Sequence, residues 1–167
     1  MEIWDAYNGK REKIGQYLVR GERIPSGLYH LCVNVLVRHE DGDVLFMRRS
    51  SQKELYPNYF EFGAGGSVLA GEDSLSAALR ELKEETGLVP SQIRLIEQTI
   101  SFEDQCLFDY YEAIVVSEKE RITYQDGETD SHIWVGIDEL RAFMKDKLIF
   151  QHQKTLLKKL IERQGDR

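Results

Sequence analysis

The sequence is poor in cysteine, has no long apolar run and carries no excess of positive charge. Its two cysteines, Cys32 and Cys106, lack the spacing of a metal-binding motif, so we expect buried free thiols. No signal peptide and no stretch of about 18 apolar residues is recognisable, which predicts a cytoplasmic protein without a membrane partner. The formal net charge is −7, so the sequence has no excess of basic residues of the kind that binding to nucleic-acid phosphates requires.

What the sequence does contain fits one globular domain over residues 1–167. Of these residues, 41% are hydrophobic and 31% are charged, which is ordinary for a folded domain. Residues 1–28, with a turn at Asn8-Gly9, predict a β-rich lead-in. Residues 138–163 predict two C-terminal helices, the first of them capped by Asp138.

Segments rich in β-branched and apolar residues predict the strands between these ends. They cover residues 29–37, 43–48, 93–102, 106–116 and 132–135. A hairpin turn at Asp41-Gly42 is expected to join the first two of them. Strands on both sides of one central helix, followed by further helices, predict an α/β (α+β) layered sandwich with a mixed sheet.

A glycine-rich loop leads into that central helix. Gly63, Gly65 and Gly66 allow backbone conformations that other residues resist, and they let a ligand approach the main chain. Asp73 is suited to cap the first turn, and Gly87 is suited to end the helix. Four residues at helical spacing predict the apolar face that packs on the core: Leu75, Ala78, Leu79 and Leu82.

Three glutamates crowd one position on this helix. Glu81, Glu84 and Glu85 have the spacing i, i+3 and i+4, and the like charges of Glu81 and Glu85 destabilise an isolated helix by a few tenths of a kcal/mol, roughly. A solvated helix face is one interpretation of such a cluster. A hard divalent cation is the other, because Mg²⁺ prefers carboxylate oxygens and can bind substrate phosphates at the same time.

The whole stretch decides between the two interpretations. Residues 66–88 follow the pattern Gly-x5-Glu-x7-Arg-Glu-Leu-x-Glu-Glu-x-Gly-Leu, with all nine fixed positions filled. This pattern resembles the signature of the Nudix hydrolases. The resemblance implies an α/β/α sandwich with the signature helix on one side of the sheet, and a Mg²⁺ cofactor, with Mn²⁺ as an alternative.

The resemblance also implies a role for each signature residue. The cation ligands would be Glu81, Glu84, Glu85 and the carbonyl group of Gly66, and Glu81 or Glu84 would be the general base. Arg80 would orient a signature glutamate and pair with Glu72. Because Nudix enzymes vary in the base, Glu128 in the acidic loop 126–130 is an alternative base or ligand, with Asp109 and Glu112 as weaker candidates.

A basic loop precedes the glycines, with Arg48, Arg49 and Lys53 close together. A solvated loop is one interpretation, and a phosphate clamp is the other. The arrangement Arg49-x3-Lys53-x3-Pro57 looks like the Nudix branch that contains isopentenyl-diphosphate isomerase, in which the corresponding arginine and lysine contact the substrate diphosphate. The resemblance therefore implies that Arg49 and Lys53 bind substrate.

The sequence departs from that branch at Gly65, and this difference favours a hydrolase over an isomerase. The isomerase uses a cysteine as acid–base group where this chain has Gly65, and glycine can transfer no proton. We therefore expect a Mg²⁺-dependent hydrolase that cleaves a diphosphate linkage in a nucleoside diphosphate-type or related organic diphosphate. The alternatives are an isomerase-like enzyme and a non-catalytic nucleotide-sensing domain. The expected partner is a small-molecule diphosphate, and exposed strand edges in the amino-terminal part allow a homodimer.

Overall fold

A computed structural model describes residues 1–165 of the chain, so the last two residues of the predicted domain lie outside the described part. The strands are β1 (Ile3–Tyr7), β2 (Lys13–Val19), β3 (His30–His39), β4 (Val44–Arg49), β5 (Phe60–Phe62), β6 (Ala64–Ser67), β7 (Gln92–Ser101), β8 (Cys106–Val115) and β9 (Thr129–Val135). The helices are α1 (Ser74–Thr86), α2 (Leu140–Asp146) and α3 (Gln151–Gly165). Within this part of the chain, none of the helices is long and apolar enough to span a bilayer.

The strands form a mixed main sheet and a separate hairpin. The main sheet has the order β5-β4-β3-β8-β7, with β6 paired to β3 and β9 paired to β4. Strands β3 and β8 run parallel over their whole length, whereas the other pairs are antiparallel. Strands β1 and β2 pair with each other in the hairpin predicted for the lead-in. The parallel pair of β3 and β8 therefore lies in the interior of the main sheet.

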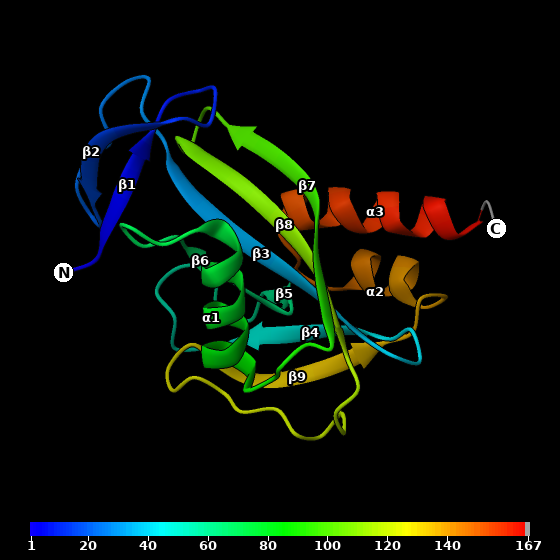
Figure 1. Ribbon diagram of the computed structural model, residues 1–167. Coiled ribbons are helices and arrows are strands. Elements are labelled where there is room, and N and C mark those ends of the chain that lie inside the picture. The colour runs from blue at the N-terminus through cyan, green and yellow to red at the C-terminus, as the bar shows by residue number, and fades with distance from the viewer. Residues whose placement is uncertain (166–167) are drawn as a thin grey trace.

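Side chains alternate along β3 between two cores, as the pleat of a strand requires. Val33, Val35 and Val37 pack with the buried alanines and leucine of α1, and Leu36 packs with residues of α2 and α3. Figure 1 shows α1 on one face of the sheet and α2 and α3 on the other. The predicted α/β/α sandwich with a mixed sheet is confirmed.

Both predicted ends of α1 are confirmed. The Asp73 side chain accepts a hydrogen bond of 2.8 Å from the Ser76 N–H, which satisfies a free amide of the first turn. Gly87 has a positive φ of 73° and donates its N–H to Lys83 O at 3.0 Å. A left-handed glycine ends a helix in this way without the strain that a Cβ would bring. The signature segment thus has the local structure that its sequence predicts.

The predicted core face of α1 is partly wrong. Leu75 and Leu79 are 43% and 39% exposed, and the buried apolar residues of the helix are Ala77, Ala78 and Leu82. The two faces have similar apolar spacing, and the small side chains of the alanines let the helix axis approach the sheet closely. The face with the smaller side chains is therefore the one that is buried.

Two other features differ from the predictions, namely the pairing of β3 with β4 and the start of α2. The turn at Asp41-Gly42 forms, with Gly42 N–H donating to His39 O, but β3 and β4 pair only between Arg38 and Val44. Strand β4 then diverges, because its backbone pairs with β9 and β5 instead. Helix α2 begins at Leu140, so Asp138 lies in the turn before the helix and does not cap it.

The glycine segment between β5 and β6 is tightly enclosed. Gly63 has a φ of +59°, and a Cβ built on it would lie 2.1 Å from Val35 O. Glycine is therefore required there both by the backbone conformation and by the space. This restriction fixes the path of the chain into β6 and hence the position of the signature loop beside α1.

Candidate active site

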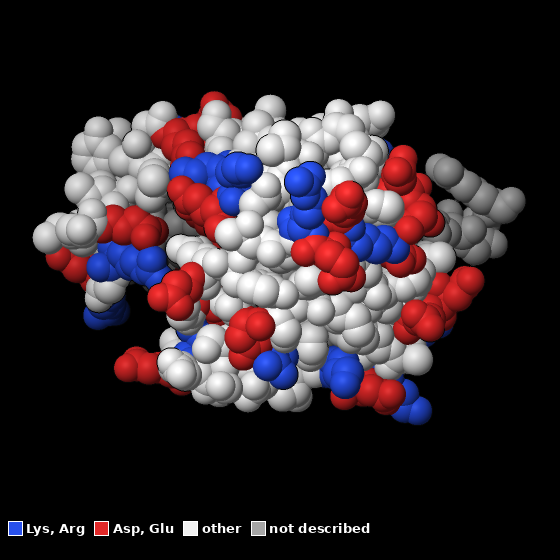
Figure 2. All heavy atoms as spheres, turned by 90° about the horizontal axis from the view of Figure 1, so that it is seen from below, with Lys and Arg blue, Asp and Glu red and all other residues white. Residues whose placement is uncertain are grey.

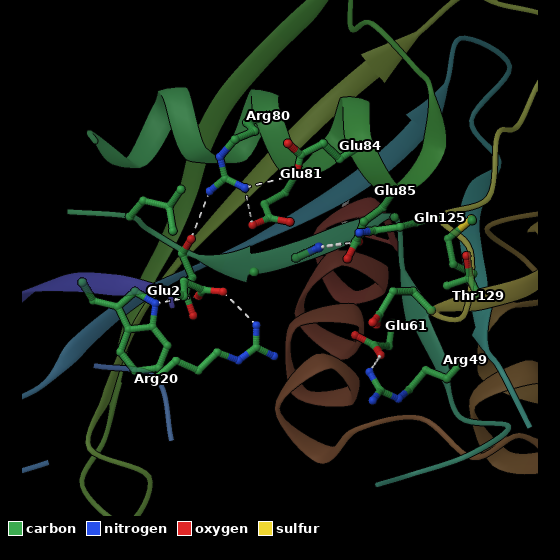
Figure 3. A pocket seen from close by; sticks show the side chains of 18 of the residues that line it. Glu2, Arg20, Arg49, Glu61, Arg80, Glu81, Glu84, Glu85, Gln125 and Thr129 are labelled. Atoms are coloured by element: carbon green, nitrogen blue, oxygen red, sulfur yellow. Dashed lines mark hydrogen bonds and ion pairs between the residues drawn. The ribbon is translucent and has the colours of Figure 1, made fainter. Parts of the chain in front are cut away.

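A cavity of about 970 Å³ opens between α1, the glycine strand β6, the amino-terminal hairpin and the loops around residues 50–59 and 125–129. It brings together eight of the residues proposed for the site from the sequence: Arg49, Lys53, Gly66, Arg80, Glu81, Glu84, Glu85 and Glu128. Figure 3 shows the α1 glutamates on one side of the cavity and Arg49 on the other. Residues from five separate segments thus meet at one place.

Arg80 connects the carboxylates at the helix end of the cavity. Its guanidinium group binds Glu72 through two bonds of 2.9 Å, Glu81 at 2.7 Å and Glu84 at 3.3 Å. It also donates to the carbonyl oxygen of Ser67 at 3.1 Å. The predicted Glu72–Arg80 pair is present, and it lowers the pKa of Glu72. The geometry gives Arg80 the role of orienting Glu81 and tying α1 to β6.

Glu85 is the most deeply placed of the three glutamates. Its carboxylate accepts a hydrogen bond of 3.1 Å from the Gly65 N–H. The pKa of Glu85 is raised to about 8, first by burial and then by the negative charges of Glu81, Glu61 and Glu128. Without a bound cation, the negative charges of these carboxylates therefore repel one another.

Glu81 lies directly against the backbone of Gly66. A Cβ built on Gly66 would be 2.2 Å from Glu81 Oε1, so only glycine leaves room for this carboxylate beside the strand. Burial raises the pKa of Glu81 even though Arg80 contacts it. Carboxylates that lie side by side and resist ionisation are a donor set that fits a hard divalent cation.

The two cations of the basic loop reach the cavity already paired. Arg49 Nη1 lies 2.6 Å from Glu61 Oε1, and Lys53 forms an ion pair with Glu128. Arg49 is held further by the carbonyl oxygens of Leu55 and Tyr56. Glu61 lies on β5 between Arg49 and the α1 glutamates (Figure 3). These two pairs place positive charge opposite the acidic side of the cavity.

Sequence reasoning missed one group of lining residues and gave two residues too much weight. Arg20 of the hairpin and Glu61 of β5 line the cavity but belong to no motif, and Glu2 and Trp4 of the hairpin line it as well. Asp109 is buried and accepts from Arg11, Ser74 and Gln98, and Glu112 is buried between Arg38 and Arg94. Neither Asp109 nor Glu112 lines the cavity, and their contacts are structural.

On one face of the molecule, charged side chains of the two signs are mixed. On the face shown in Figure 2, lysine and arginine side chains lie next to aspartate and glutamate side chains.

The NUDIX domain model matches residues 28–160 of the sequence, which includes the signature helix and the cations Arg49 and Lys53 of the basic loop. The chain belongs to the NUDIX family. The matched region starts after the amino-terminal hairpin, so the cavity walls contributed by Glu2, Trp4 and Arg20 lie outside it.

Individual Nudix relatives support the same assignment. The chain is 43% identical over 89 residues to an uncharacterized Nudix hydrolase of Listeria monocytogenes, covering 53% of each protein. It is 40% identical over 86 residues to one of Streptomyces coelicolor, covering 52% of this chain and 47% of the relative. The chain thus spans about half the length of these curated relatives.

Solved structures show the same fold at lower identity. DR0079 from Deinococcus radiodurans superposes with a TM-score of 0.77 at 21% identity, over 95% of this chain and 98% of that one. The NUDIX domain of Shewanella oneidensis NrtR, solved with ADP ribose, superposes with a TM-score of 0.64 at 19% identity, over 81% and 88%. Nudix hydrolases generally use divalent metals, and the glutamates of α1 offer the oxygen donors for one.

Proposed function

We propose that this Nudix protein is a Mg²⁺-dependent hydrolase that cleaves a diphosphate linkage in a nucleoside diphosphate-type or related organic diphosphate. The observation that carries the proposal is the meeting, in one cavity, of the carboxylates of α1 with the basic pair Arg49 and Lys53. A diphosphate needs both kinds of partner, because a cation binds its oxygens from one side and the basic side chains bind them from the other.

The residues that would hold the cation are Glu81, Glu84, Glu85 and the carbonyl group of Gly66. When bound, Mg²⁺ neutralises charge on the phosphoryl oxygens and lowers the pKa of a coordinated water. Glu84 is the first candidate to take a proton from the attacking water. Its side chain is 51% exposed and has one contact of 3.3 Å to Arg80 among the described residues, whereas Glu81 is 13% exposed and held at 2.7 Å.

Glu128 is the alternative base or ligand, and it faces Lys53. To act as a base it would have to leave that ion pair, which substrate phosphate bound to Lys53 would allow. Arg80 acts through the glutamates, because its guanidinium group fixes Glu81 and Glu84 relative to Ser67. Arg49 and Lys53 bind and orient the diphosphate.

The first prediction concerns the basic pair. Arg49→Gln and Lys53→Gln should each raise KM for the diphosphate about tenfold or more with a smaller change in kcat, because hydrogen bonds to charged groups contribute roughly 1.5–3 kcal/mol. Steady-state kinetics would measure this. Lys145→Gln, on the exposed side of α2, is the matched control and should leave KM unchanged. An unaltered KM in both clamp variants would remove Arg49 and Lys53 from the substrate site.

A second prediction concerns the contact between Gly66 and Glu81. Gly66→Ala should lower kcat at least ~10-fold, because the new methyl group would occupy the position of the Glu81 carboxylate, and small displacements of catalytic groups have effects of this order or larger. The melting temperature should change little, since the nearest atoms belong to the end of a movable side chain. Full activity in a folded Gly66→Ala variant would show that turnover does not depend on the position of the Glu81 carboxylate beside Gly66.

The proposal as a whole is tested by a Mg²⁺-dependent screen across diphosphate compounds that identifies both products. The screen should include nucleoside diphosphate sugars, because the NrtR neighbour was solved with ADP ribose. Cleavage of the diphosphate in the presence of Mg²⁺, and loss of cleavage with a chelator, is the expected result. Conversion of isopentenyl diphosphate without phosphate release, or tight nucleotide binding without turnover, would contradict hydrolysis.

A proposal about the extent of the functional unit follows from the cavity walls. The family model begins at residue 28, but Glu2 and Arg20 of the hairpin line the cavity, and the Ala70 N–H donates to Ile3 O at 2.9 Å. We infer that the amino-terminal hairpin and the Nudix region act as one domain.

A further inference from the structure

A second group of metal-binding side chains lies outside the carboxylate site. His30, Cys32 and Cys106 each offer one donor atom, and the three atoms lie within 4.8 Å of one another. The closest pair is Cys32 Sγ and His30 Nε2, at 3.0 Å. Neither cysteine is in a disulfide. Cys106 lies far from His30 and Cys32 in the sequence, so no short motif contains all three residues.

The two central strands bring the three residues together. His30 and Cys32 are two positions apart on β3, so their side chains emerge on the same face. Strand β8 runs parallel to β3 in a register that places Cys106 opposite His30. The ladder continues for ten residue pairs from that point, so the backbone that presents the donors is among the most extensively paired in the fold.

The surroundings restrict the donors further. Trp4 stacks on the His30 ring, with the ring centroids 4.4 Å apart. Cys106 is 2% exposed, and Cys32 is half-buried. The other ring nitrogen, His30 Nδ1, is buried and has no hydrogen-bond partner in the described part of the chain. Ordered, desolvated donors are a favourable starting point for a cation, because little conformational freedom remains to be lost.

The chemistry of the donors indicates which cation. Thiolate and imidazole ligands favour Zn²⁺ and other borderline-soft metals, whereas Mg²⁺ requires oxygen ligands. Zinc commonly takes three or four such ligands, and the hydroxyl group of Ser67 lies 3.9 Å from Cys32 Sγ on the neighbouring strand. We propose that His30, Cys32 and Cys106 form a second cation site of the Cys₂His type that binds Zn²⁺ and is separate from the carboxylates of α1.

The position of the cluster suggests what bound zinc would do. Cys32 pairs with Ser67 across β3 and β6, and the Ser67 carbonyl accepts from Arg80. Zinc at the cluster would tie β3 to β8 directly behind the strand that carries the signature loop. The role is structural, so the readouts are metal content and thermal stability rather than turnover.

The test begins with protein that carries no histidine tag, expressed with added zinc and passed through gel filtration in buffer with a weak chelator. Elemental analysis should find about one zinc per chain in the unmodified protein, and at least ~10-fold less in Cys32→Ser and Cys106→Ser. Glu84→Gln, which changes the carboxylate site, is the control and should retain the zinc. Equal zinc in the cysteine variants and the unmodified chain would overturn the proposal.

A spectroscopic measurement on the unmodified chain does not depend on whether the variants fold. Metal-free protein titrated with Co²⁺ should develop the thiolate-to-cobalt charge-transfer band in the near ultraviolet, and one equivalent of Zn²⁺ should abolish the band and raise the melting temperature. Absence of the band, or a mass showing that Cys32 and Cys106 have formed a disulfide in freshly purified protein, would contradict the site. Both results are independent of any diphosphate hydrolysis, so the site and the proposed function fail separately.

Discussion

Replacing Glu85 with glutamine should lower Mg²⁺-dependent turnover by ~10²-fold or more, as expected for loss of a main charge-stabilising element. The substitution keeps the shape of the side chain and the contact with the Gly65 N–H, but it removes a charge that the cation requires. In the metal-free protein the same charge is unfavourable, since burial raises the pKa of Glu85. The variant should therefore melt no lower than the unmodified chain while losing its activity.

Matched variants separate this effect from a general change of charge. Glu84→Gln, in the exposed part of the cluster, should show a similar loss of turnover. Glu103→Gln, an exposed glutamate in the turn between β7 and β8, should leave turnover unchanged. Rates measured over a Mg²⁺ titration, together with a melting curve for each variant, are the required data. A folded and fully active Glu85→Gln protein would disprove the assignment of this cation site.

Replacing Gly63 with alanine should destabilise the fold by about 3 kcal/mol, which combines the strain of a left-handed residue with overpacking. The added Cβ would lie 2.1 Å from Val35 O and 2.7 Å from a methyl group of Val37. Because the first of these contacts is with backbone, the central strand itself would have to move. Urea unfolding monitored by circular dichroism would measure the loss.

Gly21 provides the control for that experiment. It also has a positive φ, of +87°, but a Cβ there would meet no atom within 4 Å. Gly21→Ala should therefore cost about 1–2 kcal/mol, which is the conformational term alone. If the two variants were equally stable, the close packing of Gly63 against β3 would have no energetic effect.

Local features of the sequence predicted local structure well. Asp73 and Gly87 act within one turn of the helix that they cap, so their side-chain and backbone chemistry determines their role without help from the fold. The signature also predicts which carboxylates share a face, since helical spacing brings Glu81, Glu84 and Glu85 together. The predicted residues therefore meet in one cavity, although their separate roles stay predictions.

Features that depend on distant residues could not be predicted in this way. Helix α1 has two apolar faces, and only its packing against β3 shows that Leu75 and Leu79 are exposed. Glu61 gains its significance from Arg49, which is twelve positions away along the chain but contacts it directly at the cavity. The approach of Cys106 to His30 depends on the parallel register of β3 and β8, which no pattern in the sequence specifies.

The ion pairs Arg49–Glu61 and Lys53–Glu128 at the cavity have a consequence for how ligands would bind. A diphosphate that took over Arg49 and Lys53 would release Glu61 and Glu128, two carboxylates whose charges are felt at Glu85. The released charge would strengthen the attraction for a divalent cation at α1. By thermodynamic linkage, the cation would then tighten diphosphate binding by the same factor, so the two ligands would bind cooperatively within one site.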